Sequence, residues 1–260
     1  MKRVHARLGT ELVRGGRPHT RICGLRSDWP LMLRPTLPLD DGTIARWSSR
    51  DAVPAQVHQA AAAAGPIGGD RQHLRIDVGA GSALVLGEVS PTLLLPGPRG
   101  EQSHTEVDIA VGPGATLAWL PQLVIAARGC LHRADVRIAL EPGSRLLLRE
   151  QSLFGRCGER SGALRQRVRV RLGGRPLFDQ ELAVGPGLSD GCGPAITGGQ
   201  RSVGSLLLVD ADAQHSAGGD QDFAIMPLRG PGVAATALAP DTATLTRKLA
   251  AALTRILGRS

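Results

Sequence analysis

Aromatic residues are scarce in this chain of 260 residues, which has three Trp, three Phe and no Tyr. Proteins that bind single-stranded nucleic acid or RNA stack the bases on aromatic side chains, so the scarcity argues against that class. Lysine is scarce too, because the net charge of +8 comes almost wholly from arginine, as GC-rich coding sequences produce. The charge is therefore weak evidence of function, and a basic β-rich nucleic-acid-binding protein is kept only as an alternative.

Cysteines are few, and no two of the four lie in a Cys-x-x-Cys pair. Scattered cysteines are typical of free thiols in a reducing compartment rather than of a disulfide framework. The first residues carry charge but no apolar core like that of a signal peptide, and no apolar run reaches the ~18 residues of a membrane span. We therefore expect a soluble, cytoplasmic protein that does not contact a membrane.

A strand–corner–strand unit occurs three times in the chain, and each corner carries a glycine at its third position. The copies span residues 74–86, 107–119 and 136–148, with the glycines Gly81, Gly114 and Gly143. Apolar residues alternate with polar ones on both sides of each corner, as in half-buried strands. Trp119 falls on the apolar side and is predicted to lie in the core. A repeat of about thirty residues predicts a layered architecture.

The corners predict how the strands are joined. Pro113-Gly114 fits the two central positions of a type II turn, where glycine accepts a positive φ. A plain hairpin would pair Val78 with Ala83 and send the apolar side chains to opposite faces. Two alternatives remain, a bulged hairpin or a bend that carries the chain from one sheet into another. A fourth, weaker copy is predicted at residues 168–178.

The predicted fold is mostly β, a β-helix-like stack of strand layers with a C-terminal α-helix. One all-β domain covers residues 1–240 with its repeat core at about 65–183, and residues 241–260 form the helix. Short strands are also expected at Arg21–Leu25 and Leu31–Leu33. The run Ala60–Ala64 has the composition of a helix but ends after one turn at Gly65-Pro66, so we do not assign one.

The C-terminal helix is amphipathic and can be capped by Asp241 or Thr242. Its apolar stripe consists of Leu245, Leu249, Leu253, Ile256 and Leu257. This stripe either packs on the body of the chain or docks into a partner protein. The sequence leaves both alternatives open, and we carry the first four residues as partner-docking candidates.

Catalytic motifs are weak. Residues 187–191 match the Gly-x-Ser-x-Gly pattern of serine hydrolases, but Cys192-Gly193-Pro194 excludes the helix that must follow the nucleophile, so Ser189 is a poor candidate. Residues 65–70 are glycine-rich but lack the Lys-Ser/Thr of a phosphate-binding loop. We interpret them as a tight turn in which Asp70 accepts a hydrogen bond from a backbone amide. The chain is predicted not to be an enzyme.

Metal-binding signals are equally sparse. Cys130 and His132 lie two residues apart, so on a strand they would share a face and could hold a soft metal weakly. No second pair at a suitable spacing accompanies them, which argues against a structural metal site. They remain weak metal candidates, and no permanently bound cofactor is expected.

Three motifs, interleaved with the repeat in a fixed order, resemble the urease accessory protein family UreD, also called UreH. The motifs are GPIGGD at residues 65–70, LAWLPQ at 117–122 and GRCGER at 155–160. The likeness covers about residues 65–183. It implies a β-helix-like fold with a small helical part and a non-catalytic role in urease maturation.

The resemblance also implies partners and site residues. UreD proteins bind apo-urease together with UreF and the GTPase UreG, and assist nickel insertion into the urease active site, so nickel would be in transit. The family's motif glycines correspond to Gly68, Gly69 and Gly158, which we assign to backbone geometry. Asp70 and Glu159 are either structural acids or part of a polar passage, and Arg156 could pair with either one.

Overall fold

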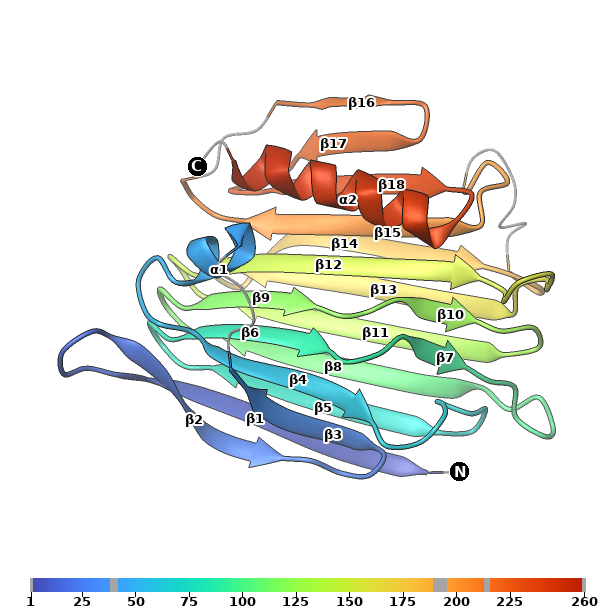
Figure 1. Cartoon of the computed structure of the whole chain (residues 1–260), viewed down its shortest axis with the longest axis horizontal. Helices are drawn as coiled ribbons and strands as arrows, with labels where there is room; N and C mark the ends of the chain where they lie inside the picture. Colours follow the sequence, from blue (N-terminus) through green and yellow to red (C-terminus); the bar gives the residue numbers. More distant parts are fainter. Residues whose placement is uncertain (1, 38–41, 189–195, 213–215, 259–260) are drawn as a thin grey trace.

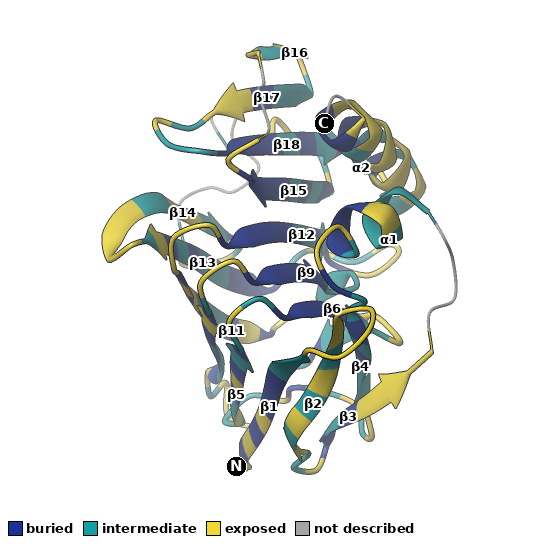
Figure 2. Ribbon diagram, turned by 90° about the vertical axis from the view of Figure 1, so that its left-hand side faces the viewer, coloured by how far each residue is buried: buried dark blue, intermediate teal, exposed yellow. Residues whose placement is uncertain are grey.

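The computed structural model describes residues 2–37, 42–188, 196–212 and 216–258, and its strands form two sheets that face each other (Figures 1 and 2). The seven-stranded sheet has the order β14 (Arg175–Val184), β13 (Ala163–Leu172), β11 (Leu131–Leu140), β8 (Ser103–Val111), β5 (Arg71–Val78), β1 (Arg3–Val13) and β2 (His19–Arg26). The eleven-stranded sheet has the order β16 (Gly218–Asp220), β17 (Phe223–Pro227), β18 (Val233–Ala239), β15 (Ser202–Val209), β12 (Arg145–Phe154), β9 (Thr116–Leu120), β6 (Ala83–Glu88), β4 (Ala55–Ala61) and β3 (Leu31–Thr36), with β7 (Thr92–Leu94) and β10 (Val124–Ala126) beside it.

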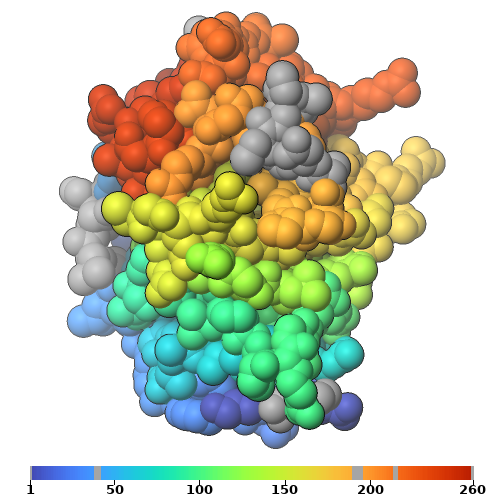
Figure 3. Space-filling model, turned by 90° about the vertical axis from the view of Figure 1, so that its right-hand side faces the viewer, coloured from blue at the N-terminus to red at the C-terminus, as the bar shows by residue number. Residues whose placement is uncertain are grey.

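The three predicted repeats are the successive coils of a β-solenoid. In each coil the chain runs along the seven-stranded sheet, bends at the glycine corner and continues in the eleven-stranded sheet, as β5–β6, β8–β9 and β11–β12. Neighbouring coils pair in parallel within both sheets. The prediction of a corner that joins two sheets is therefore confirmed. Figure 3 shows the coils stacked in sequence order, from blue at one end to red at the other.

The corners stack on one another as well as bending the chain. Gly114 has a φ of +63°, and the Ala115 amide donates to the Gly112 carbonyl at 3.1 Å, which closes the turn. The Gly81 amide donates to the Pro113 carbonyl of the next coil at 2.9 Å. A residue with a side chain is strained at this positive φ, which explains glycine in all three copies.

The prediction of a fourth copy of the corner at residues 168–178 was wrong. There β13 and β14 form an antiparallel hairpin within the seven-stranded sheet, with Leu172 paired to Arg175. The two turn residues, Gly173 and Gly174, have φ values of +53° and +77°. Two consecutive positive φ values are typical of a type I′ turn, which closes a two-residue hairpin instead of bending the chain into another sheet.

Strands near both ends of the chain extend the solenoid. The predicted strands around Pro30 are present as β2 and β3, whereas β1 was not predicted and pairs in parallel with β5. Ala60 and Ala61 are the last residues of strand β4 rather than part of a helix. Within the described residues, the short helix near the N-terminus is α1 (Thr43–Ser48). At the other end, β15, β18, β17 and β16 add antiparallel pairs.

The main core lies between the two sheets. Alternate residues of each coil point inward, so Ile76, Ile109 and Ile138 stack in register and are almost fully buried. Trp119 joins the same core at 7% exposure, which confirms its predicted place. Burial of this apolar surface is the main force that holds the sheets together.

The C-terminal helix α2 (Thr242–Leu257) packs on the outer face of the eleven-stranded sheet, over β15 and β18 (Figure 1). Asp241 caps it by accepting a hydrogen bond from the Thr244 amide at 2.7 Å. Leu245, Leu249 and Ile256 are buried in this contact, and Leu253 is partly buried. The stripe thus attaches the helix to its own sheet, and its use as a docking surface stays a prediction that requires the helix to leave this position.

Candidate functional site

Polar side chains occupy one layer of the interior between the sheets. On the seven-stranded sheet Gln72, Thr105, Ala134 and Gln166 lie opposite one another in register across β5, β8, β11 and β13. Each stands two residues before an apolar core position of its strand, so it points to the same inner face. The solenoid thereby converts four distant sequence positions into one continuous row.

The facing side chains come from the eleven-stranded sheet. They include Gln59, Glu88 and Glu150, and together with the row above they line a cavity of about 110 Å³. Burying acidic side chains is costly unless hydrogen bonds satisfy them. Their presence in an otherwise apolar interior therefore marks this layer as a candidate functional site.

Two further cavities adjoin the first, and we call the three together the cavity row. One, of about 230 Å³, shares Gln59, Gln72 and Thr92 with it and is also lined by Gly68 and Asp70. The other, of about 50 Å³, shares Glu150, Gln151 and Gln166 and extends to residues 180 and 236. The cavity row thus runs along the solenoid interior from the first glycine motif toward β14 and β18.

Glu88 is the most unusual acid of the cavity row. Burial raises the pKa of its carboxyl to about 7, although the Gln122 amide donates to it at 3.0 Å and opposes the shift. The Gln59 side-chain amide donates to its other oxygen at 3.3 Å. The carboxyl therefore changes between neutral and ionised forms near neutral pH.

Glu150 lies where the first and third cavities meet. The Gln166 side-chain amide donates to one of its oxygens, and the Ser205 hydroxyl donates to the other at 3.3 Å. Burial raises the pKa of Glu150, and these two hydrogen bonds partly offset the shift. Its carboxyl is thus held in a fixed position by both sheets.

His132 lines the same cavity as a neutral imidazole. Burial, and second the nearby His104, lower the pKa of His132 to about 3. Its Nδ1 lies 2.8 Å from the Ser103 hydroxyl, which itself lies 3.5 Å from the Leu131 carbonyl. That network fits the tautomer in which Nδ1 donates to Ser103 and Nε2 keeps its lone pair, the form in which imidazole binds metals.

Cys130 lies in a different environment from His132, and their joint metal binding stays a prediction. It precedes β11 and packs in a separate apolar cluster with Leu94, Ala126 and Phe154. Burial, and second the charge of Glu159, raise the pKa of its thiol to about 11, so it stays protonated and binds metal poorly. In the described part of the chain, His, Cys, Asp and Glu form no group of three that could hold a metal.

The first glycine motif forms the turn that was predicted. Asp70 accepts hydrogen bonds from the Ile67 amide at 3.2 Å and from the Lys2 amide at 2.9 Å, which ties β1 to the turn. A Cβ on Gly68 would lie 2.3 Å from the Gly97 amide nitrogen, so no side chain fits there. Gly69 has a φ of +93°. These residues shape one end of the cavity row.

The third motif forms a separate turn outside the walls of the cavity row. Arg156 pairs with Glu159 rather than with Asp70, through hydrogen bonds of 2.9 and 2.8 Å, and Gly158 has a φ of +71°. The hydrogen bond from Arg156 lowers the pKa of Glu159 to about 2. The residue proposed for the hydrolase alternative, Ser189, lies outside the described residues.

Sequence reasoning missed the interior acids and glutamines. Gln72, Thr105 and Gln166 have the same parity along their strands as the apolar residues that follow them, so the signal for an inward direction was present. Nothing in the sequence paired Glu150 with Gln166 across the two sheets. That contact depends on how far apart the sheets lie.

The described residues thus form a two-sheet β-solenoid with a row of buried polar side chains between the sheets. Comparison with known proteins identifies the family: UreD urease accessory protein matches residues 3–259, and the chain belongs to this family.

The chain is 40% identical to urease accessory protein UreD 3 of Streptomyces griseus, over 98% of this chain and 97% of the relative. It is 38% identical to the UreD proteins of Streptomyces avermitilis, over 98% of this chain and 97% of that protein, and of Frankia alni, over 96% and 91%. The family expected from the three motifs is confirmed, and so are relatives in high-GC actinobacteria. Neither described helix is long and apolar enough to cross a membrane.

Proposed function

We propose that this protein is a non-enzymatic helper in urease maturation, which binds apo-urease together with UreF and UreG and assists nickel insertion. The observation that carries the proposal is the cavity row, where buried carboxyl and amide oxygens follow one another through the solenoid. The family supplies the urease context. The work would take place in the cytoplasm, as the scattered cysteines suggest.

The chemistry of the cavity row suits a cargo that must be released. Oxygen ligands from Glu88, Glu150 and the glutamines are weaker partners for nickel than thiolates or clustered imidazoles. The described residues contain no closed set of three ligands, so a cation would meet few strong ligands at a time. Transfer to the urease site requires such weak, successive contacts.

A deletion and complementation experiment tests the proposal. Urease subunits and the other accessory proteins are expressed with or without this chain, and we expect loss of urease activity and of bound nickel in its absence. A tagged chain should co-purify with apo-urease and UreF. Full activity without the chain, or no co-purification, would contradict the proposed function.

A variant of Glu150 tests the role of the cavity row itself. Glu150→Gln keeps the size of the side chain but removes its charge, so we expect less nickel in urease while co-purification is kept. Glu181→Gln, on the exposed outer face, serves as the matched control. If urease matured with either variant contains the same amount of nickel, the protein would act as a scaffold without conducting nickel through the cavity row.

A further inference from the structure

The outer face of the seven-stranded sheet is left uncovered, because both described helices pack on the other sheet. Arginines alternate there with acids both along the strands and across them. One row in register contains Arg75, Asp108, Arg137 and Arg169. We call this surface the arginine face.

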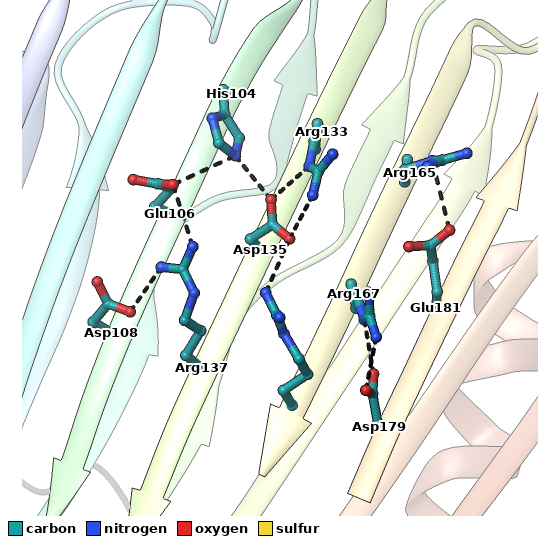
Figure 4. Close-up of polar contacts among 11 residues, drawn as sticks. His104, Glu106, Asp108, Arg133, Asp135, Arg137, Arg165, Arg167, Asp179 and Glu181 are labelled. Atoms are coloured by element: carbon teal, nitrogen blue, oxygen red, sulfur yellow. Dashed lines mark hydrogen bonds and ion pairs between the residues drawn. The ribbon is translucent and has the colours of Figure 1, made fainter.

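Arginines outnumber the carboxylates available to them on this face. Asp77 accepts from both Arg7 at 3.1 Å and Arg75 at 3.2 Å. Asp135 is shared by Arg133 at 2.6 Å and Arg169 at 3.6 Å, and it also bonds to a histidine, as Figure 4 shows for the pairs around it. Because solvent-exposed ion pairs contribute only about 0–1 kcal/mol each, Arg7 and Arg75, whose side chains are well exposed, can exchange one carboxylate for another at little cost.

Part of the arginine face is hollowed. Two adjoining hollows of about 530 and 420 Å³ share Asp77, Ala110 and Ala139 in their walls. Gly9, Asp77, Ala110 and Ala139 lie opposite one another on β1, β5, β8 and β11, so short side chains form most of the floor. Larger side chains in the neighbouring rows make a groove across the strands.

Arginines line the groove, and we define it by Arg7, Arg75, Arg137, Arg169 and Arg171. Arg169 has a buried Nε with no hydrogen-bond acceptor in the described structure, and its terminal nitrogen only approaches Asp135 at 3.6 Å. Among the residues that the structure describes, Arg171 donates to one carbonyl, that of Gly174. The buried Nε of Arg169 is out of reach of an incoming acceptor, but its side chain is 38% exposed, and the terminal guanidinium nitrogens of Arg169 and Arg171 can donate to one.

We propose that this groove docks an acidic segment of a partner protein, whose carboxylates accept hydrogen bonds from Arg169 and Arg171. Guanidinium groups bind carboxylates with two parallel hydrogen bonds, which favours this chemistry. The groove shares no wall residue with the cavity row, so the inference goes beyond the proposed transport of nickel.

The pattern of charges favours a protein over a nucleic acid. Duplex DNA presents one negative charge per ~1.7 Å of its axis without interruption. Asp77 and Asp108 stand among the arginines of the groove and would face that charge at close range. A peptide can place its acids opposite Arg169 and Arg171 and neutral residues opposite the aspartates.

The test uses the full chain and a synthetic peptide of alternating Glu and Ser. Strands are about 4.8 Å apart and an extended residue spans about 3.3 Å, so about six residues cross the four gaps between β1 and β13. Binding at low ionic strength is followed by fluorescence anisotropy, with a Gln-Ser peptide and a duplex DNA of similar length as comparisons. We expect the Glu-Ser peptide alone to bind well.

Charge reversal should then locate the site. Arg169→Glu and Arg171→Glu should each weaken binding of the Glu-Ser peptide by about tenfold or more, because the variant places like charges together. Arg229→Glu, at the exposed hairpin between β17 and β18, makes the same charge change elsewhere and should have little effect. Arg169→Lys should keep part of the affinity, and circular dichroism checks that each variant is folded.

Four results would overturn the proposal: no binding of the Glu-Ser peptide to the unaltered chain, equal binding by the groove variants, equal weakening by Arg229→Glu, or tighter binding of DNA that the groove variants abolish. The last result would assign the groove to nucleic acid. None of them depends on urease, so failure here and failure of the maturation role are seen in separate experiments.

Discussion

The two sheets of the solenoid share one interior but differ in their outer faces. The outer face of the eleven-stranded sheet carries Val85, Ala118 and Leu147, and two helices cover part of it, over β6, β9, β15 and β18. The outer face of the seven-stranded sheet carries the alternating arginines and acids and is open. The comparison shows that the outward residue of each coil, rather than the repeat itself, decides whether a sheet receives a helix or stays in contact with solvent.

The largest effect should come from the covered face. Leu249, on the face of α2 that packs against the sheet, is 3% exposed, so Leu249→Ala should lower the free energy of unfolding by about 2–5 kcal/mol through lost burial and the remaining cavity. Arg247→Ala on the exposed side of the same helix should change it by about 0.5 kcal/mol or less. Chemical denaturation measures both, and equal effects would mean that the stripe does not attach the helix.

An interior acid should differ from an outer one in its response to pH. The folded-state pKa of Glu88 is raised to about 7, so between its unfolded value of 4.5 and about 7 the folded chain holds the extra proton. Its contribution to stability is present at acidic pH and is lost as the pH rises through that window, on the order of 2 kcal/mol. We expect Glu88→Gln to flatten the plot of unfolding free energy against pH in this window.

Chemical denaturation across that pH window measures the effect. Glu181→Gln, on the exposed face, is the control, and it should keep the slope of unfolding free energy against pH seen in the unaltered chain. An unchanged slope in Glu88→Gln would show that its carboxyl is solvated rather than buried. An acid in the shared interior and an acid on the open face would then respond to pH in the same way.

Substitution of a corner glycine that joins the two sheets should have a moderate effect on stability. Gly143 has a φ of +74°, so Gly143→Ala should cost about 1 kcal/mol or more. Gly24 lies in β2, where an added Cβ would approach only the Gly9 amide nitrogen, at 3.9 Å, so Gly24→Ala provides the matched control. If the control is as destabilised as Gly143→Ala, the positive φ is not what requires glycine at the corner.

The smallest effect should come from the open face. Arg167 and Asp179 are joined at 2.7 Å, but their side chains are 37% and 47% exposed. A double-mutant cycle with alanine at both positions should give a coupling energy below about 1 kcal/mol that decreases with added salt. A larger, salt-independent coupling would show that this face is not in free contact with solvent.

The sequence allowed the solenoid coils to be predicted, because apolar alternation and the corners at Gly81, Gly114 and Gly143 are local signals. The sequence pattern led to a wrong prediction of a fourth corner at Gly173-Gly174. The flanking residues resemble those of the other copies, but these two glycines close a hairpin. Strand β1 was missed although its inward residues Val4, Ala6 and Leu8 alternate with exposed polar ones.

The candidate site was less accessible to sequence reasoning. Asp70 and the glycines of its turn were recognised, because the turn is a short local motif. The pairing of Glu150 with Gln166 and the burial of Glu88 arise from contacts between the sheets, which no local pattern encodes. The groove on the arginine face likewise depends on the register of four strands.

Obstruction of the cavity row tests the central claim most directly. Ala134 lines the first cavity, so Ala134→Leu should fill part of it, whereas Ala183→Leu places the same side chain on the outer face of β14. We predict that urease matured with Ala134→Leu contains much less nickel than urease matured with Ala183→Leu, although both variants co-purify with apo-urease. Full nickel loading with Ala134→Leu would contradict the account.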